Sequence, residues 1–303
     1  GTMLVKKSNN EDISLLGAND LAFKKCLENT LMNVTADMLD GVSNIRNYAF
    51  YKCSYLENIE IPSSVISIGH SAFYECTGLK NVTIQPGISL IENYTFYRCS
   101  ALENVTIPEG VESIGSNAFY QCSSLESIDF PSGITSIESY AFEYSGLVSL
   151  EIPQGLEEIG YYVFMHCENL ERVVLPDSVT RISSQAFYGC LLLESVTIHA
   201  TTPPNLEYNV FSNTSNTLKI YVPAAAVDQN YRIQIVDHSG CCVLCNGANR
   251  QQNCTGDMAA AILVLLPDIQ DHDLLGVHHL FGRLLGDLLI AVFVHAVSSA
   301  SGE

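Results

Sequence analysis

The chain has 303 residues, with 14 basic residues against 33 acidic ones and a formal net charge of −19. A surface this acidic repels phosphate groups, so nucleic acids and anionic membranes are excluded as expected partners. The length suits one long domain or two ordinary ones, and hydrophobic residues are plentiful enough to bury a core.

The N-terminal segment, residues 1–41, is expected to form an irregular first repeat or cap. Its first residues, Gly1 to Lys7, contain no apolar stretch long enough for a signal peptide. Gly1 and Thr2 precede Met3, which is typical of a fragment whose natural start lies elsewhere. No export signal is therefore visible in this chain.

A repeat of about 23 residues organises residues 42–227. Its most regular marker is a phenylalanine, found at Phe50, Phe73, Phe96, Phe119, Phe142, Phe164, Phe187 and Phe211. The intervals are 23, 23, 23, 23, 22, 23 and 24 residues, so the unit that starts at Phe142 is one residue short. A fixed period of this length is the signature of a stacked repeat architecture.

Each unit reads approximately A-F-Y-x-C-x-x-L-x-x-[IV]-x-I-P-x-x-[IV]-x-x-I, as in the stretch from Ala49 to Ile68. The alternation before the proline predicts a strand, and proline ends it because it has no N–H to donate. The spacings of three and four in the second half favour a short helical or 3₁₀ return. No unit can bury its apolar side alone, so stacked units are expected to share one core beneath a parallel sheet.

The phrase Ile68-Gly69-His70-Ser71-Ala72-Phe73-Tyr74-Glu75-Cys76 resembles the BspA-type leucine-rich repeat. This resemblance covers about residues 42–223. It implies a curved right-handed leucine-rich-repeat solenoid of about eight coils, with a parallel β-sheet on the concave face and short helical returns on the convex face. It also implies a cell-surface or secreted adhesin-like protein that binds a host or matrix protein or a glycan, with no cofactor and no catalytic residues.

Residues that point outward from the predicted sheet form the first candidate binding surface. With the flanking isoleucines inward, a period of two turns every second residue toward solvent. The predicted strand face consists of Asn58, Glu60, Asn81, Thr83, Asn104, Thr106, Ser127, Asp129, Ser149, Glu151, Arg172, Ser195 and Thr197. The alternative is a solvated sheet surface without affinity for any ligand.

Two further rows follow the repeat. The residue after the core phenylalanine gives a secondary aromatic ridge of Tyr51, Tyr74, Tyr97, Tyr120 and Tyr188, which either binds a partner or covers the neighbouring coil.

A row of cysteines occupies another fixed position of the repeat and consists of Cys26, Cys53, Cys76, Cys99, Cys122, Cys167 and Cys190. We interpret these as free, buried thiols, since an evenly spaced row offers no preferred disulfide pairing.

The C-terminal tail, residues 228–303, leaves the repeat. Its four cysteines include the pair Cys242 and Cys245, which is a weak zinc signal without a second pair, so no metal site is assigned. Residues 258–297 are apolar and predict a helical hairpin that covers the open end of the solenoid, and each apolar run is too short to span a bilayer. Membrane association is a lesser alternative, and a non-native continuation such as a frameshift is a third.

No enzyme motif is present: the chain lacks a phosphate-binding loop, a nucleophile elbow and a zinc-protease helix motif. The sequence therefore favours a non-catalytic binding module. The alternatives are a structural spacer or assembly module of a larger surface protein and, more weakly, a metal-dependent activity in the tail.

Overall fold

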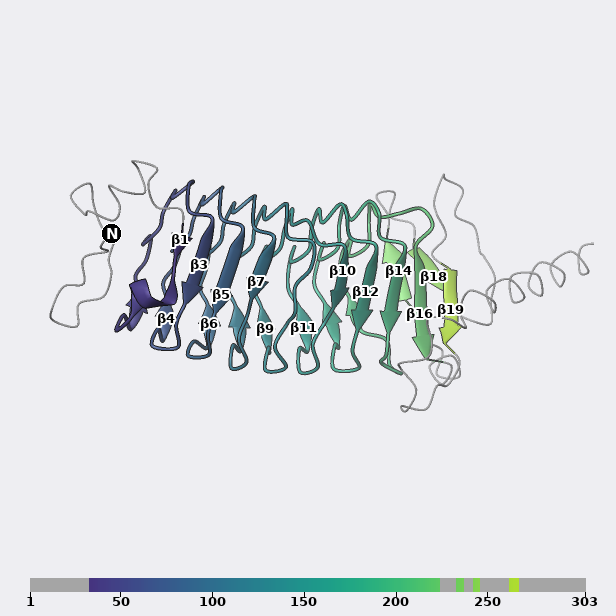
Figure 1. Ribbon diagram of the computed structural model, residues 1–303. Helices are drawn as coiled ribbons and strands as arrows, with labels where there is room; N and C mark the ends of the chain where they lie inside the picture. Colours follow the sequence, from purple (N-terminus) through teal and green to yellow (C-terminus); the bar gives the residue numbers. More distant parts are fainter. Residues whose placement is uncertain (1–32, 224–232, 237–241, 246–261, 267–303) are drawn as a thin grey trace, which may run out of the picture. The chain divides into compact units, whose positions relative to one another are not determined.

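The computed structural model describes residues 33–223, 233–236, 242–245 and 262–266. Residues 33–223 wind into a β-solenoid of about eight coils, as the repeat predicts (Figure 1). Each side of a coil has its own role. One side carries the strands of a main sheet, the opposite side carries two-residue strands, and tight turns around the core phenylalanine join them.

The main sheet is parallel and in register with the repeat. Its strands are β1 (Asn33–Val34), β3 (Asn58–Ile61), β5 (Asn81–Ile84), β7 (Asn104–Thr106), β10 (Ser149–Glu151), β12 (Arg172–Leu175), β14 (Ser195–Ile198) and β16 (Lys219–Pro223). Asn58 pairs with Asn81, and Asn81 with Asn104, so equivalent residues of successive coils are neighbours. Side chains of one phase therefore form continuous rows across the sheet.

The short strands form a second ladder on the other side of the coils. They are β2 (Asn44–Ile45), β4 (Ser67–Ile68), β6 (Leu90–Ile91), β8 (Ser113–Ile114), β9 (Ser136–Ile137), β11 (Glu158–Ile159), β13 (Arg181–Ile182) and β15 (Asn205–Leu206). This ladder runs in three pieces, with interruptions between β4 and β6 and between β9 and β11. At the first interruption the main sheet continues through β3 and β5.

Both ladders are interrupted near the middle of the solenoid, the main sheet between β7 and β10 and the second ladder between β9 and β11. Among the described strands, β1–β9 pair only with one another, and none of them pairs with β10–β16 (Figure 1). We call these groups the N-terminal block and the C-terminal block. Residues 138–148 connect them and begin the unit that is one residue short. Gly146 lies so close to the preceding coil that a Cβ atom there would lie 2.3 Å from the Ser123 carbonyl oxygen, as Gly78 does in a full-length unit, at 2.1 Å from Ser54 O.

The returns around each phenylalanine are turns, so the expectation of helical returns is wrong. The only helix in the described residues is the 3₁₀ helix η1 (Ala36–Leu39). In the other coils, bonds to the next coil replace the bonds that would continue a helix: Ala49 N–H donates to Arg46 O at 3.2 Å, but Phe50 N–H donates to Ala72 O at 2.7 Å. The backbone N–H groups of the turn point in turn to their own coil and to the next coil. Left-handed backbone conformations at Tyr48 (φ 60°) and Lys52 (φ 57°) make this change of direction possible.

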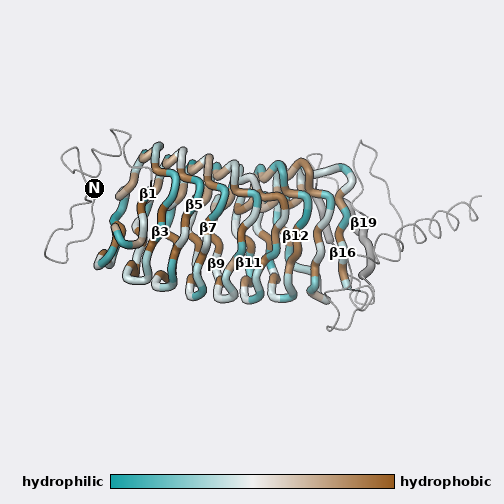
Figure 2. Tube along the Cα trace, viewed as in Figure 1, coloured by the Kyte–Doolittle hydropathy of each residue, from teal (hydrophilic) through white to brown (hydrophobic). Residues whose placement is uncertain are grey.

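The core is a continuous stack of phenylalanine rings. From Phe50 to Phe211, neighbouring ring centroids are 5.0 to 5.6 Å apart, and the rings are nearly parallel. Around it lie the buried Leu, Ile and Val residues of the repeat. Figure 2 shows the resulting alternation of hydrophobic and hydrophilic segments along each coil. The apolar residues of each repeat are thus buried in one shared core, because every coil covers its neighbour.

The repeated cysteine links adjacent coils beside this stack by a hydrogen bond. Each described thiol donates a hydrogen bond to the phenylalanine carbonyl of the preceding coil, as in Cys76 to Phe50 at 2.8 Å and Cys99 to Phe73 at 3.1 Å. Cys76, Cys99, Cys122, Cys167 and Cys190 are free and buried, which confirms the interpretation for these five. Cys53 differs because it is disulfide-bonded. Its partner is not one of those five, and Cys26 lies outside the described residues.

The five buried thiols are expected to resist alkylation in the folded protein. Burial raises their pKa values well above the ordinary value, that of Cys167 to about 12, and only the thiolate reacts. Iodoacetamide followed by peptide mass spectrometry should find these sites unmodified at pH 8 and fully modified after denaturation. Rapid modification of Cys99 under native conditions would contradict the packing described above.

The described parts of the tail are strands. β17 (Ile233–Val236) pairs antiparallel with β18 (Cys242–Cys245), so the cysteine pair lies on a hairpin strand. β19 (Ile262–Leu266) follows β16 in the main-sheet order, and the helix predicted over these five residues is therefore wrong. A short apolar run does not distinguish helix from strand by its periodicity. The remainder of the predicted hairpin lies outside the described residues.

Candidate binding surfaces

The strand face of the N-terminal block is an asparagine ladder. The side-chain amide of Asn58 donates to Asn33 at 2.6 Å, Asn81 donates to Asn58 at 2.6 Å, and Asn104 donates to Asn81 at 2.8 Å. Each of these amides is oriented by its neighbour, since the parallel register places identical side chains side by side. The ladder forms a rigid polar row along β1, β3, β5 and β7.

A second row runs beside the ladder on the same face. Glu60 pairs in register with Thr83, and Thr83 with Thr106. Glu60 and Thr106 are exposed and Thr83 is half-buried. No hydrogen bond or ion pair within the described chain engages the Glu60 carboxylate, so it is available to a ligand.

The strand face continues with different chemistry in the C-terminal block. Ser149, Arg172, Ser195 and Lys219 occupy the phase of the asparagines and pair in register, and Arg172 is exposed. Glu151, Val174 and Thr197 form the second row. The two blocks thus present different faces, one made of amides and the other of alternating hydroxyl and basic groups.

Ser127 and Asp129 do not lie on a strand, and their assignment to one is wrong. Residues 126–131 form no ladder, although both side chains are exposed. The physical reason is Phe130, which replaces the isoleucine found before the proline in most other units. Its partly buried ring packs edge-on against Phe142, with centroids 5.8 Å apart at 86°. The strand face is therefore interrupted at the block boundary.

Four of the five predicted ridge tyrosines form a stack. Centroid distances from Tyr51 to Tyr74, Tyr97 and Tyr120 are 5.2, 4.6 and 4.7 Å in turn. All four rings are half-buried, so each covers its neighbour and still keeps an exposed edge. Tyr188 lies outside this stack, and its ring meets His166 edge-on, with centroids 5.5 Å apart.

Charged side chains border the ridge. Glu75 forms ion pairs with Lys52 at 3.2 Å and with Arg98 at 3.4 Å. Lys52 lies 5.2 Å from the centroid of the Tyr51 ring, and Arg98 lies 5.2 Å from that of Tyr97. These cation–π contacts hold the basic groups against the aromatic edge.

The ridge ends at Glu143, which replaces tyrosine in the unit that begins at Phe142. Glu143 is only 8% exposed. Within the described chain its carboxylate forms no hydrogen bond or ion pair. Burial raises the pKa of this carboxyl to about 7. The pKa of nearby Tyr120 is raised by burial and then by the charge of Glu143. Sequence reasoning missed this buried carboxyl, because the repeat indicated only a missing tyrosine at this position.

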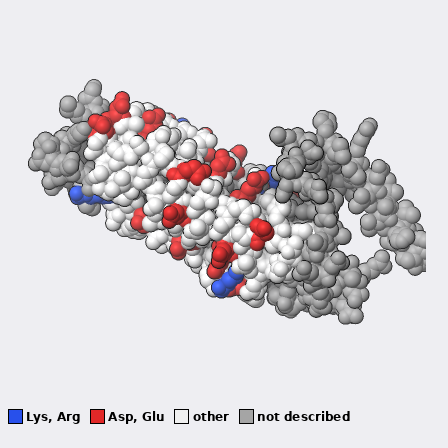
Figure 3. All heavy atoms as spheres, turned by 90° about the horizontal axis from the view of Figure 1, so that it is seen from below, with Lys and Arg blue, Asp and Glu red and all other residues white. Residues whose placement is uncertain are grey.

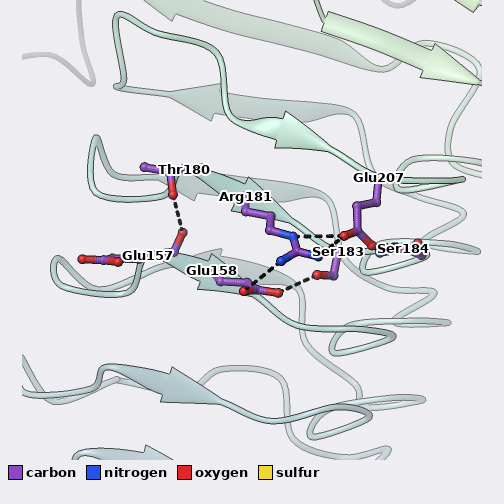
Figure 4. A network of polar contacts seen from close by, with 7 residues as sticks. All are labelled: Glu157, Glu158, Thr180, Arg181, Ser183, Ser184 and Glu207. Carbon is purple, nitrogen blue, oxygen red and sulfur yellow. Dashed lines mark hydrogen bonds and ion pairs between the residues drawn. The ribbon is translucent and has the colours of Figure 1, made fainter.

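A polar network spans three coils of the second ladder (Figure 4). Arg181 lies between Glu158, whose Oε2 is 3.7 Å from its Nη1, and Glu207, whose Oε1 accepts from its Nε at 3.0 Å. Ser183 donates to Glu158 at 2.7 Å, and the Ser184 hydroxyl donates to Glu207 at 2.9 Å. The Arg181 guanidinium lowers the pKa of Glu207. Sequence reasoning missed this network because no repeat phase specifies charge.

A groove lies on the same side of the solenoid, at the block boundary. It has a volume of about 600 Å³ and is lined by residues 135–139 and by residues in the range 155–161. The lining includes Glu138, Glu157, Glu158 and Tyr161, and contains no lysine or arginine. It coincides with the place where β9 and β11 fail to pair.

A family model for the BspA-type leucine-rich repeat region matches residues 19–148 and 135–230, with six copies. The chain belongs to this family. Members of it are generally non-catalytic repeat proteins, and surface proteins occur among them.

Solved leucine-rich-repeat structures are similar to this chain. A T. pallidum leucine-rich repeat protein is 29% identical, with a TM-score of 0.49, over 54% of this chain and 78% of its own. A Bacteroides ovatus repeat protein is 28% identical, with a TM-score of 0.40, over 60% of each chain. A leucine-rich cell surface protein of Faecalibacterium prausnitzii is 26% identical, with a TM-score of 0.41, over 60% of this chain and 64% of its own. Among proteins of curated function, none matches.

Two negative findings concern the described residues only. They contain no group of three or more His, Cys, Asp or Glu side chains arranged to hold a metal ion. They also contain no helix of the length and apolarity that crossing a bilayer requires. The metal-dependent activity considered as an alternative for the tail would use cysteine side chains that lie outside the described ones.

Proposed function

We propose that the protein is a surface-exposed, adhesin-like binding module that engages a host or matrix protein through the strand face of its N-terminal block. The observation that carries this proposal is the in-register row of Glu60, Thr83 and Thr106 beside the asparagine ladder. Polar groups repeated in register along a sheet suit a partner with a complementary repeat, and the hydrogen-bonded asparagine ladder beside them loses little side-chain entropy on binding.

The chemistry of this face favours recognition over catalysis. Its side chains recur from coil to coil, whereas an active site needs one unique arrangement of acid, base or nucleophile. A surface location is supported by the family and by the cell-surface relative of Faecalibacterium prausnitzii. The ligand is accordingly sought among extracellular proteins and glycans.

The test is a triple variant of the second row. The purified chain is screened by surface plasmon resonance against a panel of immobilised extracellular-matrix proteins, and the variant is then measured on any that binds. E60A/T83A/T106A is expected to weaken binding by about tenfold or more, because centrally placed contacts dominate an interface.

The matched control is S63A/S64A/E112A, which changes three exposed side chains outside the strand face. It should keep the wild-type affinity, and circular dichroism should show both variants folded. An unaltered affinity in the strand-face variant would remove this face from consideration.

A further inference from the structure

The groove between the two blocks lies at one of the two interruptions of the second ladder. Except between β4 and β6, adjacent coils elsewhere in the second ladder are held by backbone bonds, such as Gly115 N–H to Ile91 O at 2.8 Å and Ser183 N–H to Ile159 O at 2.8 Å. Between residues 135–139 and 155–160 the structure has no backbone hydrogen bond. The two coils nevertheless remain close, since a Cβ atom on Gly160 would lie 3.2 Å from the Ile137 carbonyl oxygen.

The side chains that line the groove are acidic on both walls. Glu138 follows β9 on one wall, and Glu157 precedes Ile159 of β11 on the other; both are exposed, and neither forms an ion pair within the described chain. Glu158 is different, because Arg181 and Ser183 hold it on the side of the next coil. Two carboxylates therefore remain uncompensated in the groove.

The surroundings reinforce this charge. Figure 3 shows groups of Asp and Glu side chains along one face of the solenoid, with Lys and Arg in only a few places. The whole chain carries a formal net charge of −19. A groove between low-dielectric walls concentrates such a field and attracts cations. Since the described residues contain no three-carboxylate cluster suited to a metal ion, the geometry favours a larger cationic ligand.

We propose that this groove binds an extended segment of a partner protein that carries lysine or arginine side chains. Glu138 and Glu157, one on each wall of the groove, accept the cationic groups. Tyr161, 41% exposed at the groove, offers its ring to the aliphatic stem of a lysine or the plane of an arginine. The inference rests on the proposed function in that it gives the binding module a second site for its partner.

The experiment uses the full chain and a fluorescein-labelled peptide of alternating lysine and serine, about eight residues long. Fluorescence anisotropy should detect binding that salt weakens, and a peptide with glutamate in place of lysine should not bind. E138Q/E157Q is expected to raise Kd about fivefold, as the loss of two ion pairs between exposed groups predicts. E103Q/E126Q removes the same charge at exposed sites outside the groove and should change Kd less than about twofold.

Each other outcome overturns the proposal. Equal weakening by both double variants would mean that the peptide senses only the overall charge. Unchanged binding in E138Q/E157Q would place the peptide elsewhere. Binding of a neutral sugar such as maltohexaose, lost in E138Q/E157Q while the lysine peptide fails to bind, would identify a glycan site. The strand-face variant E60A/T83A/T106A leaves the groove intact, so failure at one site is distinguishable from failure at the other.

Discussion

Replacing Phe142 with alanine is expected to lower the free energy of unfolding by about 3–5 kcal/mol and to separate the unfolding of the two blocks. Its ring is fully buried between Phe119, at 5.1 Å, and Phe164, at 5.6 Å. Because no strand pair joins the blocks, this stack and the turn bonds, such as Phe142 N–H to Val163 O at 2.9 Å, carry the connection. Solenoid stability is a sum of unit and interface contributions, so loss of one interface uncouples its two sides.

The matched control is F73A, which removes a ring at the same repeat phase inside the N-terminal block. Its coil is also held by the strand pairs on either side of it. F73A should cost a similar free energy but keep a single unfolding transition. Urea unfolding, followed by hydrogen exchange of peptides from each block, separates the cases. A single cooperative transition in F142A would show that the boundary is not a weak interface.

Replacing Glu143 with glutamine is expected to stabilise the protein at pH 8 and to have little effect at pH 4.5. Burial without a partner raises the pKa of this carboxyl from 4.5 to about 7, so the folded state binds its proton more tightly than the unfolded state does. The stability that this proton contributes is fully present below pH 4.5. It is lost as the pH rises through 7. Glutamine has no charge to bury at any pH.

The expected difference in unfolding free energy is about 1–3 kcal/mol, a discounted value because solvent screens part of the charge. The measurement is urea unfolding of wild type and E143Q at both pH values. E103Q, which changes an exposed carboxylate, is the control and should follow the wild type. An equal effect of E143Q at both pH values would indicate a packing change and contradict the buried charge.

The solenoid, its period and its core phases could be predicted from the sequence because each coil repeats the same solution. Phe, Cys, Leu and Ile recur at fixed positions, and any one unit reports on all the others. The asparagine ladder could be predicted in part: the repeat places Asn58, Asn81 and Asn104 on one strand face, but it does not predict the hydrogen bonds between their side chains. Their side-chain bonds follow from parallel pairing at about 4.8 Å.

What could not be predicted depends on departures from the repeat. Phe130 is conservative by hydropathy, yet its ring is too large for the isoleucine position and the sheet stops there. The returns looked helical because spacings of three and four fit a helix, but bonds between coils compete for the same N–H groups. Arg181, Glu158 and Glu207 meet across coils, and periodicity carries no information on the sign of a charge.

The fixed register also bears on how such a chain can change through its gene. Each strand residue pairs with the one a whole unit later, so gain or loss of a complete 23-residue unit leaves the remaining pairs aligned. Unequal crossing-over between repeats therefore lengthens or shortens the rod by one coil, about 4.8 Å, without a new fold. A single-residue deletion shifts the pairing instead: the second ladder is interrupted between β9 and β11, where the unit that is one residue short begins. Single-residue insertions and deletions in the gene should therefore be rarer than the gain or loss of whole units.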